Sequence, residues 1–243
     1  MKEKYFKKVK KIGLRLIPYI IGVILGLFVI QFDFLESITS DFSFYKVVLL
    51  ILSIFGMFYL HIIMHEFGHF LGGLISKFDF YAFRIGPLVF EKENNKVIFK
   101  IQNNIAYSGC IMLPKNSENF ERKLLVYYIG GIAINFILSL LFLIGYISLG
   151  SPSFSKTFFV IGAIIGFAFI LINSVPFKSQ GIKNDGANIL SLIRKSPKDL
   201  AEIMVVYISM QVTTGVEPKD LDPVFLRRNK NLPKDEMLGI GLN

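Results

Sequence analysis

The run from Val47 to Ile75 is long and apolar enough to cross a bilayer, and Glu66 is its only formally charged residue. Glu66 lies within His65-Glu66-Phe67-Gly68-His69, a His-Glu-x-x-His segment. A carboxylic acid between two imidazoles is costly in hydrocarbon, so a span that carries them is expected to have a function that needs them. A solvated helix face, the ordinary explanation for a chance match, does not account for Glu66 in such a run.

The spacing of the two histidines predicts a metal site. Residues four apart share a face of a helix, so His65 and His69 can direct two imidazoles at one ion. Glu66 is then placed to take a proton from an attacking water, an arrangement typical of zinc hydrolases. His61 lies one turn before His65. We expect it to support the site or line a cavity instead of binding the ion, because the later pair already has suitable geometry.

The apolar residues fall in long blocks and make up 53% of the 243 residues. We therefore predict an all-α polytopic membrane protein with about four transmembrane helices. A small membrane-associated β-sheet or hairpin is expected between the second and third spans. The first block follows a basic segment without a small-residue cleavage pattern, which favours a retained anchor over a signal peptide. The four blocks are Ile12–Ile30, Val47–Ile75, Leu124–Leu149 and Thr157–Val175.

The basic residues behind the net charge of +9 flank the spans and form no folded basic domain, which argues against a nucleic acid partner. Seven Lys and Arg precede residue 16, whereas acidic residues predominate between residues 31 and 46. The positive-inside rule then places both termini and the 76–123 segment in the cytoplasm of a multi-pass cell-membrane protein. The metal site would lie near the cytoplasmic end of the second span. The abundance of Lys, Ile, Phe and Asn is typical of an AT-rich bacterial genome.

Three regions follow from this reading: an N-terminal anchor helix and external loop (1–46), a catalytic core (47–186) and a cytoplasmic helical tail (187–243). Between the second and third spans, Asn94-Asn95 tolerates a left-handed turn and predicts a hairpin. Gly72-Gly73 would allow another backbone to approach the metal helix, or would end that helix. The expected strands are Val89–Glu93, Lys96–Ile101 and one around Ala106–Leu113, after a turn or strand start at Arg84–Pro87. The expected tail helices are Ala187–Lys195 and Lys198–Gln211, with a break at Ser196-Pro197.

A catalytic zinc site needs a third protein ligand besides the two histidines. Cys110 is the single cysteine, so there is no thiolate cluster, and we expect it to pack as a small apolar residue. Asp185 follows the fourth block at the predicted depth of the histidines and is the preferred ligand. The alternatives are that Asp185 only caps the following helix at a turn, or that Asp79 or Glu91 of the sheet completes the site.

Taken in order, these motifs resemble the site-2 protease family of intramembrane zinc metalloproteases (peptidase family M50), over about Val47 to Gly186. The resemblance rests on HEFGH, Arg84-Ile85-Gly86-Pro87, Gly131-x-x-x-Asn135, and Asn173-x-x-Pro176 leading to Asp185-Gly186. It implies that His65, His69 and Asp185 hold one zinc ion per chain and that Glu66 activates water. It also implies that Asn135 and Asn173 help to seat the substrate backbone. Hydrogen bonding between helices is the alternative role for these two residues.

The chain departs from the family pattern at three places. Ile132 follows Gly131 where the family commonly has Pro, and Gly109-Cys110 stands where a Gly pair is usual. The gap from Pro176 to Asp185 is longer than usual, which bears directly on where Asp185 lies.

The resemblance implies an intramembrane zinc metalloprotease that hydrolyses peptide bonds of a membrane-embedded or membrane-associated protein or peptide. The substrate would be a single-span membrane protein, a signal-peptide remnant or a secreted peptide precursor, surrounded by membrane lipid and held by an edge strand of the 84–113 segment. The alternative is a catalytically silent membrane binding or immunity protein that retains the fold, although Glu66 has no use in a binding site. The absence of an inverted repeat in the sequence disfavours a transporter or channel component.

Overall fold

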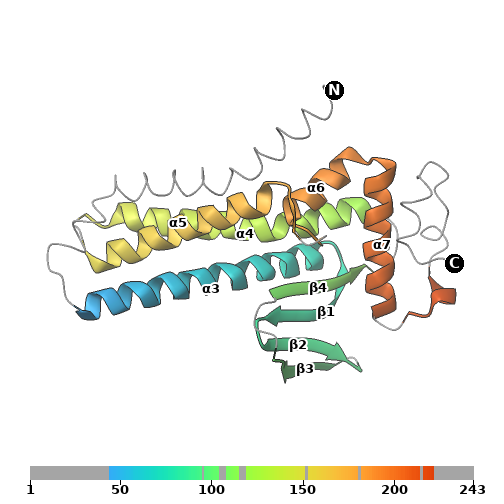
Figure 1. Cartoon of the computed structure of the whole chain (residues 1–243), viewed down its shortest axis with the longest axis horizontal. Coiled ribbons are helices and arrows are strands. Elements are labelled where there is room, and N and C mark those ends of the chain that lie inside the picture. The colour runs from blue at the N-terminus through green and yellow to red at the C-terminus, as the bar shows by residue number, and fades with distance from the viewer. Residues whose placement is uncertain are drawn as a thin grey trace.

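Three helices in the part of the chain that the structure describes are long and apolar enough to cross a membrane. The computed structural model describes residues 44–94, 96–103, 108–114, 119–150, 153–179, 182–213 and 216–221. The three helices lie side by side along the long axis of the molecule (Figure 1). They are α3 (Phe44–Ile75), α4 (Phe120–Ser148) and α5 (Phe154–Ser174). These helices match three of the four predicted spans, and the predicted first span, Ile12–Ile30, lies outside the described residues.

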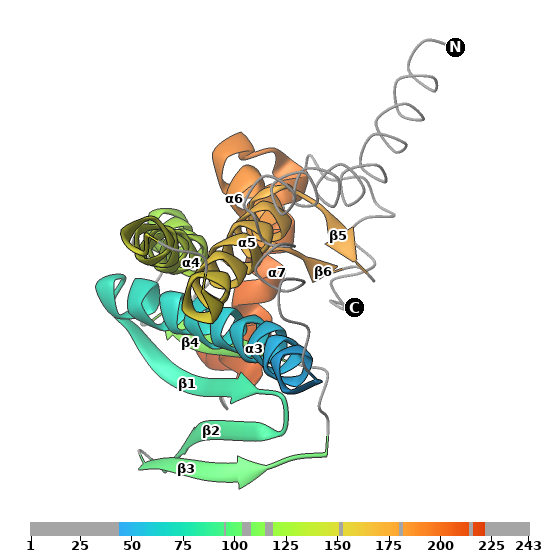
Figure 2. The same ribbon diagram turned by 90° about the vertical axis from the view of Figure 1, so that its left-hand side faces the viewer.

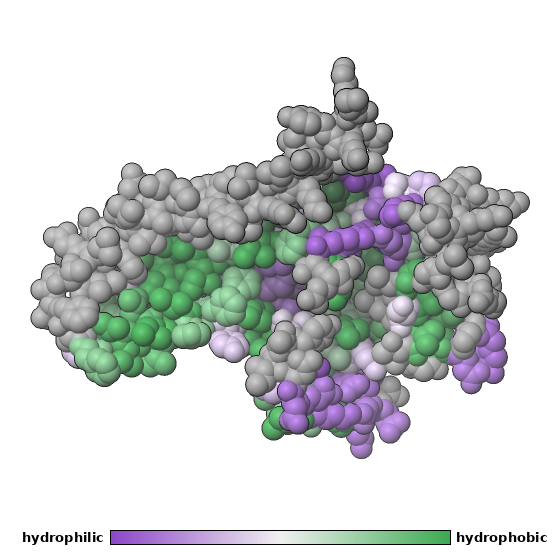
Figure 3. Space-filling model, in the orientation of Figure 1, coloured by the Kyte–Doolittle hydropathy of each residue, from purple (hydrophilic) through white to green (hydrophobic). Residues whose placement is uncertain are grey.

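The surface of α3 is apolar along much of its length. Large apolar side chains such as Leu52 and Phe55 are 60% and 61% exposed. Figure 3 shows this apolar surface over α3, separate from the hydrophilic surface near the sheet and α6. Exposed apolar surface of this extent is expected where lipid surrounds a helix, so it fits a membrane protein.

Glycines let α3 and α4 touch backbone to backbone. A Cβ added to Gly68 would lie 2.3 Å from the carbonyl oxygen of Gly130, and one added to Gly72 would lie 2.7 Å from that of Val126. Small residues at such positions allow membrane helices to pack closely. The prediction that Gly72 admits another backbone is therefore confirmed. The alternative, that the glycine pair ends the helix, is wrong because α3 continues to Ile75.

A four-stranded antiparallel sheet lies against the C-terminal end of α3, with the order β3-β2-β1-β4 (Figures 1 and 2). Its strands are β1 (Phe78–Ile85), β2 (Leu88–Glu93), β3 (Lys96–Ile101) and β4 (Ser108–Pro114). The predicted hairpin is confirmed as β2 and β3, and Asn94 has the left-handed φ of 48°. The last predicted strand is confirmed as β4, although residues 104–107 lie outside the described parts.

Strand β1 was not predicted. It pairs with both β2 and β4, but its register with β4 shifts between Phe80 and Ala82. Such a bulge breaks the alternation of apolar and polar residues by which a strand is recognised. The expected turn or strand start at Arg84–Pro87 corresponds to the end of β1 and the turn into β2.

Cys110 belongs to a buried apolar cluster between the sheet and α4, as predicted for a packed small residue. Its side chain is 5% exposed, and burial raises the pKa of its thiol to about 12. The cluster anchors the sheet and the two tail helices to the bundle. Its buried members are Phe78, Cys110, Met112, Phe120, Leu124, Tyr127, Leu192, Ile203 and Tyr207.

The tail contains the two predicted helices, α6 (Asp185–Arg194) and α7 (Pro197–Thr213), separated near Ser196 as expected. In Figure 1, α7 runs across the end of the helical bundle. Two short strands precede α6 and were not predicted: β5 (Lys178–Ser179) and β6 (Ile182–Lys183), which pair antiparallel. A short 3₁₀ helix, Pro218–Asp220, follows α7, and the end of the predicted tail from residue 222 lies outside the described residues.

Candidate metal centre

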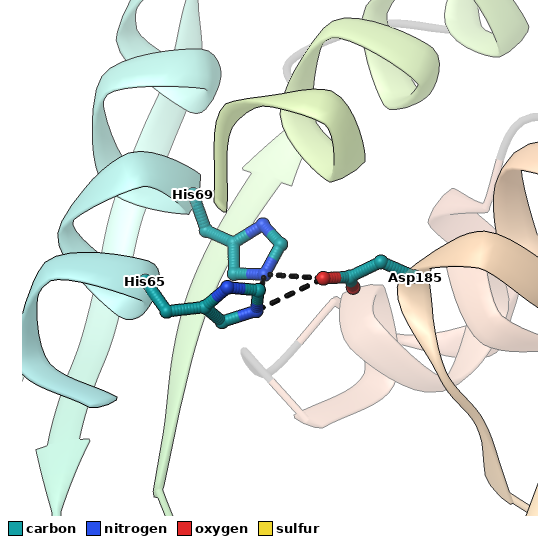
Figure 4. A group of neighbouring side chains, drawn as sticks. All are labelled: His65, His69 and Asp185. Carbon is teal, nitrogen blue, oxygen red and sulfur yellow. Dashed lines mark hydrogen bonds and ion pairs between the residues drawn. The ribbon is translucent and has the colours of Figure 1, made fainter. Parts of the chain in front are cut away.

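Three potential ligand atoms converge at the end of the bundle near the sheet. The Nε2 atoms of His65 and His69 are 3.1 Å apart. Oδ2 of Asp185 lies 2.9 Å from the first nitrogen and 3.3 Å from the second. Figure 4 shows the two imidazoles on α3 pointing at the carboxylate at the start of α6. Among the described residues, these three form the group of side chains suited to hold a metal ion, and we call the group the metal cluster.

The donor set fits zinc. Two imidazole nitrogens and one carboxylate oxygen are a known ligand combination for catalytic zinc, with a fourth position left open. Zinc–nitrogen distances near 2 Å in a tetrahedral site separate the ligand atoms by about 3.3 Å, close to the separations found here. Oδ2 of Asp185 is buried and accepts no well-directed hydrogen bond, despite the two nearby nitrogens. A cation between the three atoms would satisfy it.

Asp185 is held as a carboxylate in this site. Burial alone would raise its pKa, but the imidazoles of His65 and His69 outweigh this effect and lower the pKa to about 2. A metal ligand must be deprotonated, so this environment prepares Asp185 for that role.

Asn184 explains how Asp185 reaches the metal cluster despite the long gap after Pro176. Its amide nitrogen donates to the carbonyls of Ile172 and Val175 at the end of α5, each at 2.8 Å. Its amide oxygen accepts from the N–H of Ala187 in the first turn of α6, at 3.0 Å. One side chain therefore joins the end of α5 to the start of α6, and the paired strands β5 and β6 lie between the two helices in the sequence.

Gly186 allows this close connection. A Cβ at this position would lie 2.1 Å from the carbonyl oxygen of Ser174. The helix cap expected in the alternative reading is provided by Asn184, while Asp185 occupies the first position of α6. The cap residue Asn184 and the cluster residue Asp185 are therefore adjacent in the sequence and have separate roles.

A backbone carbonyl orients the imidazole of His69. Its Nδ1 lies 2.9 Å from the carbonyl oxygen of Tyr127, which can only accept, so Nδ1 carries the proton. The lone pair of Nε2 is then free to face Asp185, an arrangement common among metal-binding histidines. Gly131 makes room for both rings, because a Cβ there would lie 2.8 Å from His65 Cε1 and 2.8 Å from His69 Nε2.

Glu66 lies beside the cluster and is 8% exposed. The hydroxyl of Ser108, the first residue of β4, donates a hydrogen bond to its Oε1 at 3.2 Å. The proposed base is thus linked to the strand nearest the metal helix. Ser108 was not among the sequence candidates, because nothing in its neighbourhood indicates a contact with a residue 42 positions earlier.

Asn135 and Asn173 occupy different environments. Asn135 is fully buried, and its Nδ2 lies 3.4 Å from Nδ1 of His65. Asn173 donates to the carbonyl of Phe169 in its own helix, at 3.0 Å. The structure therefore brings Asn135 to the metal cluster and leaves the Asn173 amide bonded within α5.

The alternative ligands in the sheet lie apart from the cluster. Glu91 accepts hydrogen bonds from Tyr81 and Lys100 on the sheet. Asp79 lies in β1 opposite Leu113 of β4. Of the carboxylates considered, Asp185 is the one that meets the two imidazoles.

Comparisons with protein-family models, with curated proteins and with solved structures each found no match to this chain. The chemistry of the site therefore rests on the residues and their geometry alone.

Proposed function

We propose that this protein is an intramembrane zinc metalloprotease of the site-2 protease type. The observation that carries the proposal is the convergence of His65, His69 and Asp185, with Glu66 one residue from the first ligand. Bound zinc would polarise the scissile carbonyl and lower the pKa of a water molecule to about 7. The zinc would be held by these three side chains, one ion per chain.

Glu66 performs the proton transfers in this proposal. Its carboxylate takes a proton from the attacking water and returns it to the leaving amine. Ser108 holds one carboxylate oxygen by its hydrogen bond, which leaves the other oxygen for the reacting groups. Glu66 is buried, which would limit the access of bulk water to its carboxylate.

Strand β4 is the part of the sheet that can hold an extended substrate next to Glu66. Its edge is partly occupied, because Tyr127 donates to the carbonyl of Cys110 and Gln211 donates to that of Pro114. A substrate strand would therefore add at the Ser108 end, beside the base. A membrane-embedded segment must be extended there, since the amides of an intact helix are shielded by their own hydrogen bonds.

The substrate is, in this proposal, a membrane-embedded or membrane-associated protein or peptide, such as a single-span protein, a signal-peptide remnant or a secreted peptide precursor. We place the metal end of the bundle toward the cytoplasm of a bacterial cell, on the distribution of Lys and Arg around the spans. A topology reporter fused after Ser117 should be cytoplasmic. An external reporter at that position would reverse this orientation.

Substitution of Glu66 by Gln tests the proposal. Membranes that contain wild-type protein and membranes that contain Glu66→Gln would be compared by mass spectrometry of newly formed peptide termini. We expect cleavage products with the wild type and none with Glu66→Gln, whose zinc content should remain near that of wild type because the two side chains are nearly isosteric. Glu91→Gln is the matched control, since Glu91 belongs to the sheet and not to the cluster.

Two results would contradict the proposal. Full activity of a purified Glu66→Gln protein would remove the general base. Zinc binding by the wild type without any cleavage would favour the alternative, a catalytically silent membrane binding or immunity protein.

A further inference from the structure

His61 is a fully buried histidine on α3, one turn before His65, and it contacts both α4 and α5. Its Nε2 lies 2.9 Å from the carbonyl oxygen of Gly162 on α5. Its Nδ1 lies 3.1 Å from Oδ1 of the Asn135 side chain on α4. A Cβ on Gly166 would lie 2.4 Å from His61 Cε1, so α5 has a space shaped for this imidazole.

The carbonyl of Gly162 fixes the proton on His61. A carbonyl oxygen can only accept a hydrogen bond, so Nε2 of His61 must be the protonated nitrogen. A neutral imidazole then has a lone pair on Nδ1, and a charged one would be costly in an apolar span. Nδ1 therefore needs a donor, whereas the atom opposite it is Oδ1 of Asn135, which can only accept.

The amide of Asn135 satisfies both of its histidines in one orientation only. Its oxygen and nitrogen have nearly the same shape and can exchange places by a half turn. In the structure Oδ1 faces His61 and Nδ2 lies 3.4 Å from Nδ1 of His65. A half turn of the amide places its nitrogen toward His61 and its oxygen toward Nδ1 of His65. This oxygen can accept the N–H of His65.

With the amide turned in this way, a directed chain of hydrogen bonds ends at the metal cluster. His65 donates through Nδ1 to Asn135, Asn135 donates to Nδ1 of His61, and His61 donates through Nε2 to Gly162. The lone pair of His65 is then on Nε2, the atom that lies 2.9 Å from Asp185. Without the half turn, Asn135 would donate to His65 Nδ1, and the proton of His65 would be on Nε2, the atom that faces Asp185.

We propose that His61 is a positioning residue that acts through Asn135 to fix the metal-binding tautomer of His65. This inference rests on the metal site of the proposed function, but it concerns zinc affinity and not peptide cleavage. Hydrogen-bond partners of metal-bound histidines raise affinity by holding the tautomer and the ring orientation. If His61 only bridged the helices, loss of the acceptor at Nδ1 would not change zinc affinity.

Two substitutions of similar size separate these roles. His61→Leu removes the acceptor near Asn135, whereas His61→Asn can place an amide oxygen close to the position of Nδ1. We expect zinc affinity to fall about 10- to 100-fold in His61→Leu and to recover most of this loss in His61→Asn. The affinity would be measured on the purified full-length protein by competition with a chromophoric chelator. Met57→Leu, one turn earlier in the same buried helix face, is the control and should match wild type.

A double substitution tests the route through Asn135. If His61 acts through Asn135, Asn135→Leu should weaken zinc binding to a similar degree, and adding His61→Leu should weaken it no further. If His61→Leu does not fold, His61→Gln serves in its place. Gln can donate to Gly162 but offers no acceptor near Asn135, so it should also lose affinity.

The outcomes distinguish this inference from the proposed function. Equal zinc affinity in wild type and His61→Leu would overturn it, as would equal losses in His61→Leu and His61→Asn. A wild-type protein without zinc affinity would overturn both ideas. If the variants follow the expected order but no membrane substrate is cleaved, the positioning role stands and the protease proposal fails.

Discussion

The two ends of α3 are built in different ways. Near its beginning, apolar side chains such as Leu52 and Phe55 are exposed to the surroundings. From His61 onward every buried residue of α3 is a histidine, a glutamate or a glycine. We call the part of α3 up to Met57 the apolar half and the part from His61 the polar half. Around Met57 the helices meet through bulky side chains such as Phe142 and Ile161, whereas around Gly68 the backbones of α3 and α4 touch.

This difference indicates which part of α3 tolerates substitution and which part does not. Apolar packing in a membrane tolerates substitution, because lipid is as apolar as the side chains it replaces. The second half of α3 instead holds polar groups away from water and brings ligand atoms within 3.3 Å of one another. Small displacements there change the chemistry, so substitutions in the two halves should have different consequences.

Removal of the Asp185 carboxylate, which faces the polar half of α3, should have the largest effect on zinc binding. Asp185→Ala leaves two protein ligands, so zinc should fall from about one per chain to near zero, with loss of cleavage. Metal analysis of purified protein checks this result. Asp79→Ala and Glu91→Ala should retain zinc, and the opposite pattern would move the third ligand to the sheet.

A methyl group at Gly131 should also weaken zinc binding by the histidines of the polar half. It would lie 2.8 Å from an atom of each ligand histidine, so zinc affinity should fall by about 100-fold or more in Gly131→Ala. Gly56→Ala is the control in the apolar half, because a Cβ there meets nothing within 4 Å. Chelator competition measures the zinc affinity of both variants. Wild-type affinity in Gly131→Ala would contradict this prediction.

A cavity in the apolar half should reduce stability without affecting the metal. Met57→Ala should destabilise the protein by about 2 kcal/mol, the lower end for such changes, because loss of packing remains while lipid replaces water as the alternative environment. Thermal unfolding in detergent would show the lower stability, and metal analysis should show unchanged zinc. Loss of zinc in Met57→Ala would mean that the two halves are not independent.

The smallest effect is expected at Ser108. Ser108→Ala removes one hydrogen bond to Glu66, worth about 1.4 kcal/mol, which corresponds to about a tenfold lower cleavage rate. Zinc content should not change, since Ser108 contacts Glu66, the proposed base, and not the residues of the metal cluster. A drop in zinc instead of rate would show that β4 supports the metal itself.

The sequence predicted those parts of the fold that have a strong and regular pattern. Long apolar runs predicted the three described helices, and Asn94 with its flanking strands predicted the β2–β3 hairpin. Strand β1 escaped prediction because its bulge interrupts the alternation of side chains. Strands β5 and β6 have two residues each, too few for any periodic pattern to be recognised.

The metal cluster itself was predictable because its chemistry limits the choice of residues. Two histidines on one helix face require a third ligand, and Asp185 is now found beside them. The contacts of Asn135 with His61 and His65 could not be foreseen, since they join residues 74 and 70 positions apart and depend on how α3 and α4 pack. Ser108 was missed for the same reason.

The side chain of Asn184 has a consequence for handling the protein in the laboratory. Because the Asn184 amide joins the end of α5 to the start of α6, we expect residues inserted into the chain between them to leave Asp185 in place. A short epitope or fluorophore-binding tag inserted between Ser179 and Ile182 should therefore report on abundance and location without altering the chemistry.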